Sequence, residues 1–121
     1  MFNTHFPLTA DAQTKAADLV AERIRRIAGT TPRVLTGDFN CGPDSEPWRL
    51  LERQGLHSAE TAAGGGGHSH TFHRQGRADK CIDAIFVSSE WRVAAFDLLD
   101  RKGGGVWPSD HFGLLAELAL P

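Results

Sequence analysis

Arg33-Val34-Leu35-Thr36-Gly37-Asp38-Phe39-Asn40 is the stretch that decides how the rest of the chain is interpreted. Val34 and Leu35 follow a proline, which is excluded from helix interiors, so they indicate a short buried strand. Gly37 lets the backbone turn where the strand stops. Asp38 and Asn40 are two residues apart, and such residues share one face of a strand. We therefore expect both polar side chains to project together from a sheet edge, where α/β folds bind ligands.

This pairing of an acid with an amide has two interpretations. A carboxylate accepts hydrogen bonds, and an amide both donates and accepts them, which suits a site that binds a cation or activates water beside an oxygen-rich substrate. The alternative is an Asx-rich turn that opens the next helix. Asp44 and Ser45 already provide capping residues for that helix, so Asp38 and Asn40 are not needed there.

Length and composition restrict the possible architectures and partners. The 121 residues allow a single domain with a modest core. The 13 basic and 15 acidic residues give a formal net charge of −2, which argues against a general nucleic-acid-binding surface. Two cysteines argue against a disulfide framework and favour a reducing compartment, so we expect a cytoplasmic location. The apolar runs are too short for a membrane span.

The hydrophobic pattern of the first forty residues predicts a βαβ unit. A strand at residues 1–6 precedes a helix that Thr9 can cap and Gly29 closes, and the strand at residues 33–37 follows. The predicted apolar stripe of the helix consists of four residues at helical spacing: Ala16, Val20, Ile24 and Ile27.

The remaining chain adds a second helix and then a β-rich part. The helix is expected at residues 44–54, residues 56–63 are uninformative, and four glycines at 64–67 form a flexible loop. Beyond them we expect a short strand at 69–73, a polar turn at 75–80, and strands at 81–87, 91–99 and 114–120. The pattern therefore predicts an α/β (α+β) fold.

Asp83 and His111 are the most informative polar residues of this second part. A carboxylate within the apolar run at 81–87 is costly to bury unless it is paired, although it could also be a strand-edge acid that faces solvent. His111 is a plausible partner, since an acid that orients an imidazole is common in general acid–base sites. Asp110 could point elsewhere as a metal ligand. The alternative for residues 109–111 is a polar turn.

The other histidines carry less information about function. His5 follows the first strand and by itself has no diagnostic context. His68, His70 and His73 flank the glycine run and suggest a transition-metal site. That interpretation carries the least weight, because no acid or cysteine stands at ligand spacing and the glycines provide no preorganisation.

The order of these polar segments resembles the endonuclease/exonuclease/phosphatase superfamily, which has a deoxyribonuclease I-like fold. The motifs that carry the resemblance are Asn3-Thr4-His5, Gly37-Asp38-Phe39-Asn40, Ile82-Asp83-Ala84-Ile85-Phe86-Val87-Ser88 and Ser109-Asp110-His111-Phe112. The Pro43–Pro47 segment before a helix and Thr71-Phe72-His73 before the acidic strand also look like the family. The resemblance covers nearly the whole chain.

The resemblance implies a four-layer αββα sandwich and hydrolysis of a phosphate ester with Mg²⁺ or Mn²⁺. By the same resemblance, Asp38 is the acid that orients or deprotonates the attacking water, and Asn40 fixes a phosphate oxygen and the orientation of that acid. Asp110, with Asp38, is the implied metal ligand.

The histidines also receive roles from the resemblance. His5 looks like the residue that contacts the phosphate near the leaving group. Asp83 resembles the carboxylate paired with His111, and His111 resembles the residue that stabilises charge on the scissile phosphate. Imidazolium, amide and metal are suitable groups, because negative charge gathers on the non-bridging oxygens during phosphoryl transfer.

The chain also departs from the family, whose domain is about twice this length. The resemblance therefore implies that residues 1–121 are a partial domain, the C-terminal half of the sandwich truncated at its N-terminus, and that a metal-binding Glu of the family has no counterpart. Two functions remain open: a metal-dependent phosphodiesterase, nuclease or phosphatase, and a catalytically inactive fragment or non-catalytic remnant. The expected substrates are nucleic acid, nucleotide or phospholipid head group, and the exposed truncated face predicts self-association.

Overall fold

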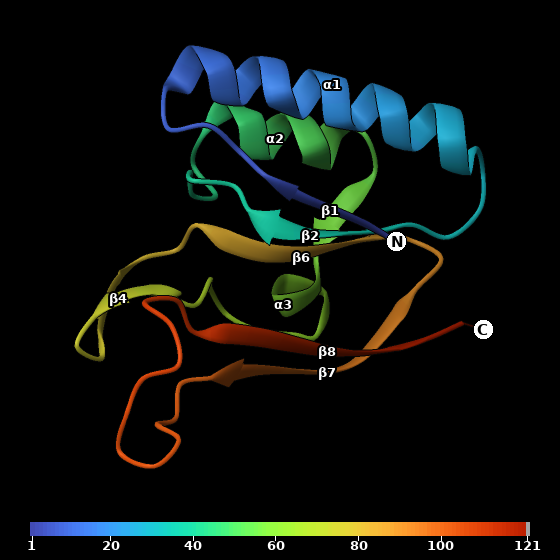
Figure 1. Cartoon of the computed structure of the whole chain (residues 1–121). Coiled ribbons are helices and arrows are strands. Elements are labelled where there is room, and N and C mark those ends of the chain that lie inside the picture. Colours follow the sequence, from blue (N-terminus) through green and yellow to red (C-terminus); the bar gives the residue numbers. More distant parts are fainter. Residues whose placement is uncertain (121) are drawn as a thin grey trace.

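Two parallel strands and the helix between them form the N-terminal part of the structure, a computed structural model that describes residues 1–120 (Figure 1). Strand β1 (Phe2–His5) lies beside β2 (Val34–Asp38), and α1 (Ala10–Ala28) connects them. The predicted βαβ unit is confirmed. Its register aligns His5 with Asp38, so two of the predicted site residues lie at the same end of neighbouring strands.

Strand β2 is an inner strand of a four-stranded sheet with the order β1-β2-β6-β3. Strand β6 (Asp83–Ser88) runs antiparallel to β2 and pairs Asp83 with Asp38, while β3 (Leu56–Ser58) pairs with the far side of β6. His5, Asp38 and Asp83 thus form one row across three strands. The sheet itself brings these three residues together.

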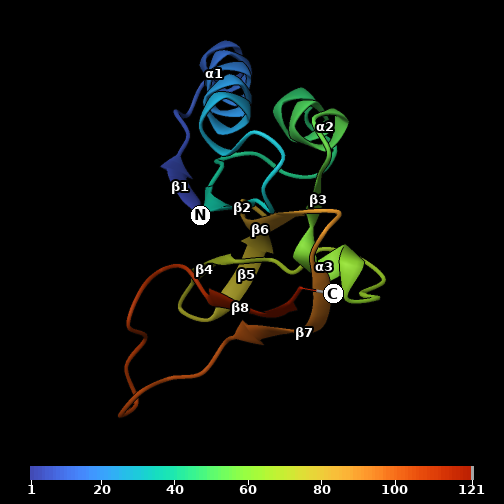
Figure 2. The same ribbon diagram turned by 90° about the vertical axis from the view of Figure 1, so that its right-hand side faces the viewer.

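Helices α1 and α2 (Glu46–Arg53) cover one face of this sheet (Figures 1 and 2). Ser45 caps α2 by accepting a hydrogen bond from the backbone N–H of Trp48 at 3.4 Å, as the sequence predicts. The core between the helices and the sheet contains edge-to-face aromatic rings, with centroids 5.2 Å apart for Phe39 and Phe86 and 4.7 Å apart for Trp48 and Phe86. This packing holds Phe39, and with it the end of β2.

A long hairpin lies across the opposite face of the sheet (Figure 2). It consists of β7 (Arg92–Leu99) and β8 (Gly113–Ala119), which pair antiparallel. A smaller hairpin pairs β4 (Phe72–Arg74) with β5 (Arg77–Lys80). The helices, the four-stranded sheet and the β7–β8 hairpin are successive layers, and this arrangement confirms the α/β fold class.

Four details differ from the sequence-based expectations. Residues Arg77–Lys80 form strand β5 instead of a polar turn, because backbone pairing with β4 compensates for the lack of apolar residues. Residues 56–63, which carry no clear pattern, contain β3 and the short helix α3 (Ala59–Ala62). Ile27 is 68% exposed, so it does not belong to the buried face of α1, and Thr9 occupies the N-cap of α1 without a side-chain cap hydrogen bond. The residues of α1 that are buried are Gln13, Ala17, Ala21 and Ile24.

The close approach of β1 to β2 generates a stability prediction for Gly37. A Cβ atom on Gly37 would lie 2.0 Å from the carbonyl oxygen of Thr4, so β1 and β2 would have to move apart. We expect Gly37→Ala to lower the free energy of unfolding by about 1–3 kcal/mol, as overpacking does elsewhere. Urea denaturation followed by tryptophan fluorescence measures the change.

The matched control is Gly66→Ala, because a Cβ at Gly66 would have no heavy atom within 4 Å. The control should unfold at the wild-type urea concentration. Equal stability of Gly37→Ala and the wild-type protein would contradict the register described for β1 and β2.

Candidate active site

The row of polar residues opens into a cleft of about 500 Å³ between the sheet and the start of β8. Strands β1, β2 and β6 line one wall with His5, Asp38 and Asp83, and His111 stands just before β8 on the other side. The structure therefore brings four of the predicted site residues to one cleft. They come from four separate segments of the chain.

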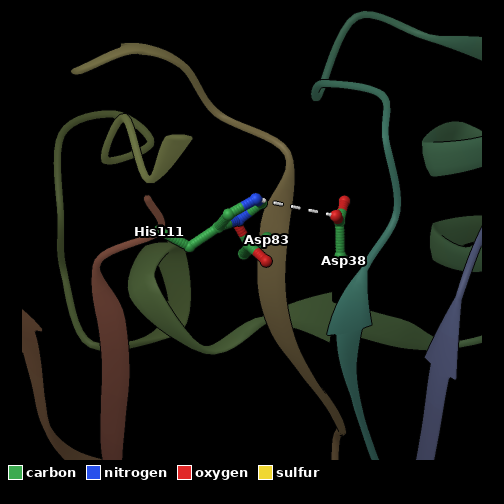
Figure 3. Close-up of side chains that lie close together, drawn as sticks. All are labelled: Asp38, Asp83 and His111. Atoms are coloured by element: carbon green, nitrogen blue, oxygen red, sulfur yellow. Dashed lines mark hydrogen bonds and ion pairs between the residues drawn. The ribbon is translucent and has the colours of Figure 1, made fainter. Parts of the chain in front are cut away.

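His111 and Asp83 form the tightest polar contact of the cleft. The His111 Nδ1 atom lies 2.7 Å from Asp83 Oδ2, and the two side chains are only 26% and 19% exposed. An ionised carboxylate has no proton to donate, so Nδ1 must carry the proton in this hydrogen bond. The other ring nitrogen, Nε2, lies 3.9 Å from Asp38 Oδ2, and Figure 3 shows the ring directed toward Asp38.

The carboxylates around His111 change its acid–base behaviour. Partial burial alone lowers the pKa of His111, but the hydrogen bond to Asp83 and the charges of Asp83, Asp38 and Asp110 outweigh burial and raise the pKa above its ordinary value of 6.5. The imidazolium form is therefore favoured at higher pH than in an isolated histidine. The cleft therefore holds a cationic group over a wider pH range than an isolated histidine would provide.

Asp38 is oriented by its own turn. Its Oδ1 atom accepts a hydrogen bond from the backbone N–H of Asn40 at 2.8 Å, which is an Asx turn. Its Oδ2 atom faces the two histidines, 3.5 Å from His5 Nε2 and 3.9 Å from His111 Nε2. The two interpretations of Asp38 weighed from the sequence are therefore compatible: one oxygen fixes the turn, and the other is directed into the cleft.

Asn40 does not share the face of Asp38, so this part of the sequence-based prediction is wrong. Strand β2 ends at Asp38, and Asn40 adopts a φ of 51°, which breaks the two-residue alternation of a strand. The Asn40 side-chain amide donates to the Phe6 carbonyl at 2.8 Å, and the Asn40 backbone carbonyl accepts from Gln13 Nε2 at 2.9 Å. Asn40 therefore contacts Asp38 through its backbone and is not among the cleft-lining residues.

The side chains suited to a metal ion form a smaller group than the sequence predicts. Within residues 1–120, Asp38, Asp83 and His111 each offer one ligand atom, and these atoms lie within 4.8 Å of one another. Two carboxylates and an imidazole form a donor set compatible with a divalent cation that keeps some of its waters. Asp110 is exposed and lies outside this group. The predicted pairing of Asp38 with Asp110 is thus not seen in the side-chain positions.

Two of the three histidines near the glycine run, His68 and His73, pack against aromatic rings. The His68 ring meets Trp48 edge-on at 5.2 Å between centroids. His73 is 2% exposed, stacks on Phe112 at 4.1 Å, and accepts the Gly76 N–H at Nδ1. In the described part of the chain, His68, His70 and His73 form no group at metal-ligand distance. The transition-metal interpretation therefore has no geometric support.

The two cysteines are free thiols near the base of the site. Burial is the main cause that raises the pKa of Cys81, to about 11, and the charges of Glu60 and Asp83 add to it. Burial likewise raises the pKa of Cys41. Both thiols are therefore protonated at neutral pH, so neither is an activated nucleophile.

Two contacts at the edge of the cleft, one polar and one aromatic, could not be predicted from the sequence. Asn3 donates through Nδ2 to Thr36 Oγ1 at 2.8 Å, which joins β1 to β2 beside the cleft. The Phe72 ring meets the His111 ring edge-on at 5.3 Å and restricts its tilt. Asn3 and Phe72 belong to the motifs quoted from the sequence. The residues that they contact depend on the strand register and on the path of the loops, which the sequence alone does not specify.

Across residues 1–120, no helix is long and apolar enough to cross a membrane.

The raised pKa of His111 predicts a pH-dependent contribution to stability. Because the folded protein binds this proton more tightly than the unfolded chain does, the stabilisation is fully present below about pH 6.5 and is lost as pH rises through the higher folded pKa. Asp83→Asn removes the hydrogen-bonded charge and should remove most of this contribution, because Asp38 and Asp110 also raise the pKa of His111. The wild-type advantage in unfolding free energy over Asp83→Asn should therefore shrink between pH 6 and pH 9, measured by urea denaturation in buffer with EDTA. A difference that stays constant with pH would contradict the charged contact.

Comparison with known proteins identifies the fold. A structure from Bacteroides vulgatus, described as an endonuclease/exonuclease/phosphatase, is 29% identical, with a TM-score of 0.83 over 99% of this chain and 50% of that chain. The mannosyl-6-phosphatase of Bacteroides thetaiotaomicron is 25% identical, with a TM-score of 0.83 over 98% of this chain and 51% of that chain. The human Nocturnin catalytic domain shares the fold at 22% identity, with a TM-score of 0.76 over 98% of this chain and 46% of that chain.

This chain therefore spans about half the length of the solved structures that it matches. A search of curated proteins gave no match. The model of the Endonuclease/Exonuclease/phosphatase family matches residues 2–111, which include every site residue predicted from the sequence. The chain belongs to the endonuclease/exonuclease/phosphatase family.

Proposed function

We propose that this chain carries the site of a metal-dependent phosphoesterase, of the phosphodiesterase, nuclease or phosphatase type. The single observation that supports the proposal most strongly is the His111 ring, which Asp83 holds by a 2.7 Å hydrogen bond and which directs Nε2 toward Asp38 Oδ2 across an open cleft. Family membership supports the same class of reaction. The similarity to a phosphatase at 25% identity is consistent with it.

In the proposed mechanism, Asp38 orients and deprotonates the attacking water through Oδ2, while the Asx turn holds its other oxygen. His111, kept protonated by its carboxylate neighbours, donates from Nε2 to a non-bridging phosphate oxygen, where negative charge develops. Asp83 keeps the His111 ring in place and stabilises its charge. Asn40 supports Asp38 through its backbone N–H.

His5 stands at the mouth of the cleft with 72% of its side chain exposed, and in the proposal it contacts the phosphate near the leaving group. A divalent cation, Mg²⁺ or Mn²⁺, would neutralise phosphate oxygens when bound. We assign its ligation to Asp38 and Asp83, whose carboxylate oxygens belong to the group within 4.8 Å; Asp110, the ligand that the family resemblance implies, lies outside this group. The proposed substrates are phosphate esters of nucleic acid, nucleotide or phospholipid head groups.

The activity prediction uses four variants in two matched pairs. Purified protein is assayed on single- and double-stranded DNA, RNA, nucleotides, sugar phosphates and phospholipid head-group esters, with Mg²⁺ or Mn²⁺ and with EDTA. We expect metal-dependent turnover that Asp38→Asn or His111→Ala lowers by about 10²–10⁴-fold, the range for loss of a general acid or base. The controls are the exposed residues Asp18 and His57, and Asp18→Asn and His57→Ala should retain wild-type rates.

Turnover that is equal in EDTA would remove the metal from the proposal, and an unaffected Asp38→Asn rate would remove Asp38 from the mechanism. Folded protein that turns over none of these substrates would favour the second candidate, a non-catalytic remnant of such an enzyme. The observation behind this alternative is that the chain spans about half the length of its structural relatives. On the same basis we propose that residues 1–121 form the C-terminal half of a family domain.

We also propose self-association through the open edge of the β7–β8 hairpin. Within residues 1–120, β8 pairs only with β7, and an unpaired edge offers backbone hydrogen bonds to another strand. Leu115 on β8 is 49% exposed. We expect the wild-type protein to dimerise in light scattering and sedimentation, and Leu115→Lys to shift it to a monomer. Leu19→Lys, at a residue of α1 that is 52% exposed, is the control that should leave the dimer intact. A monomeric wild-type protein would overturn the proposal.

A further inference from the structure

Thr71 is a buried polar residue with no role in the proposed mechanism. It precedes β4 and has an exposed fraction of 0%, and it does not line the cleft. It nevertheless lies between the segment that carries Asp83 and the segment that carries His111. A fully buried hydroxyl must have hydrogen-bonding partners, because an unpaired polar group in the interior is destabilising.

The hydrogen bonds of Thr71 reach three separate places in the chain. Its backbone N–H donates to the Lys80 carbonyl at 2.8 Å, which ties it to the end of β5. Its carbonyl accepts from the Phe112 N–H at 2.8 Å. Its Oγ1 atom accepts from the backbone N–H groups of Asp83 at 3.2 Å and Ile82 at 3.4 Å. One residue therefore holds Asp83 itself and the immediate neighbour of His111.

The hydrogen bonds of Thr71 constrain the distance between Asp83 and His111. The Asp83–His111 contact is 2.7 Å long, and its partners are 28 residues apart in the sequence. Backbone hydrogen bonds that join these two segments limit how far the two partners of this contact can move apart. The neighbouring hydrogen bond from the His73 N–H to the Asp110 carbonyl at 2.8 Å fixes the other side of the His111 segment, but it does not reach β6.

We propose that Thr71 is a positioning residue that sets the Asp83–His111 pair, with its hydroxyl fixing the start of β6 and its carbonyl fixing the segment of His111. The catalytic consequence rests on the proposed phosphoesterase function, whereas the structural consequence does not. Valine has nearly the shape of threonine but cannot accept a hydrogen bond, so Thr71→Val leaves two buried N–H groups without their acceptor. Serine keeps the acceptor and loses only a methyl group.

The test reads the state of the His111 ring directly, without any substrate. Nitrogen-15 NMR distinguishes which ring nitrogen carries the proton, and His111 signals are assigned by their loss in His111→Gln. At a pH high enough for the ring to be neutral, we expect the wild-type protein and Thr71→Ser to show a single tautomer with Nδ1–H, hydrogen-bonded to Asp83. In Thr71→Val we expect this signature to be lost or mixed, because Asp83 is no longer held opposite Nδ1.

The control variant must lose a buried hydrogen bond that does not involve the Asp83–His111 pair. Ser88 is also fully buried, lies at the other end of β6, and accepts the backbone N–H of Arg33 at 2.8 Å. Ser88→Ala therefore removes a comparable buried acceptor from the same strand. It should be destabilised yet keep the wild-type His111 signature. If loss of any buried hydroxyl disturbed the site, Thr71→Val and Ser88→Ala would both change the His111 signature.

The outcomes separate this proposal from the proposed function. A folded Thr71→Val protein with the wild-type His111 signature would overturn the positioning role, and so would loss of the signature in Ser88→Ala. If Thr71→Val does not fold, Thr71→Ala takes its place. We then expect Thr71→Ala to lose the His111 signature, and a wild-type signature in this variant would overturn the positioning role. If the protein is active, Thr71→Val should lower kcat by about ten- to a hundredfold with little change in KM, because misplaced catalytic groups act on the chemical step. Inactivity of every variant would count against the enzyme and leave the NMR result decisive for Thr71.

Discussion

The register of β2 between β1 and β6 is the constraint on which the rest of the site depends. Leu35 is fully buried beneath the helices, and alternation along the strand then directs Asp38 to the opposite face. The same register sets His5 and Asp83 on either side of Asp38. A shift of the β2 register by one residue would expose Leu35 and bury Asp38. Because burial of Leu35 stabilises the observed register, the hydrophobic core also determines the geometry of the polar row.

His111 is placed differently, because it lies outside the four-stranded sheet and is paired through an isolated antiparallel bridge to Phe72 of β4. It comes from the segment between β7 and β8, and its position depends on backbone hydrogen bonds to the segment before β4 and on the contact with Asp83. The site is therefore built from two kinds of structure. One is a rigid row of three strands, and the other is a loop-borne imidazole that is held against that row. The partial burial of Asp83 makes this pairing favourable, since a carboxylate taken from water requires a compensating partner.

The sequence was sufficient for those features that depend on local pattern. The βαβ unit, the α2 cap at Ser45 and an acid in an apolar strand at Asp83 could all be predicted, because spacing and residue type determine them. The strand Arg77–Lys80 could not, since its stability comes from pairing with β4 and its residues are polar. Asn40 was misplaced because a positive φ ended the alternation, and strand periodicity does not reveal where alternation stops. The cross-link made by Thr71 depends on long-range contacts that no local pattern encodes.

The Asp83–His111 contact also has a thermodynamic consequence. It joins β6 to the segment that leads into β8, so it forms part of the cleft wall and contributes to the folded state at the same time. A molecule that binds Asp38 and His111 together would bind the native state and not the unfolded chain. Saturation at about a hundred times the dissociation constant would then add about 2.7 kcal/mol to the unfolding free energy. Thermal denaturation is therefore a general detector of ligands for this cleft, whatever their chemical identity and whether or not they are turned over.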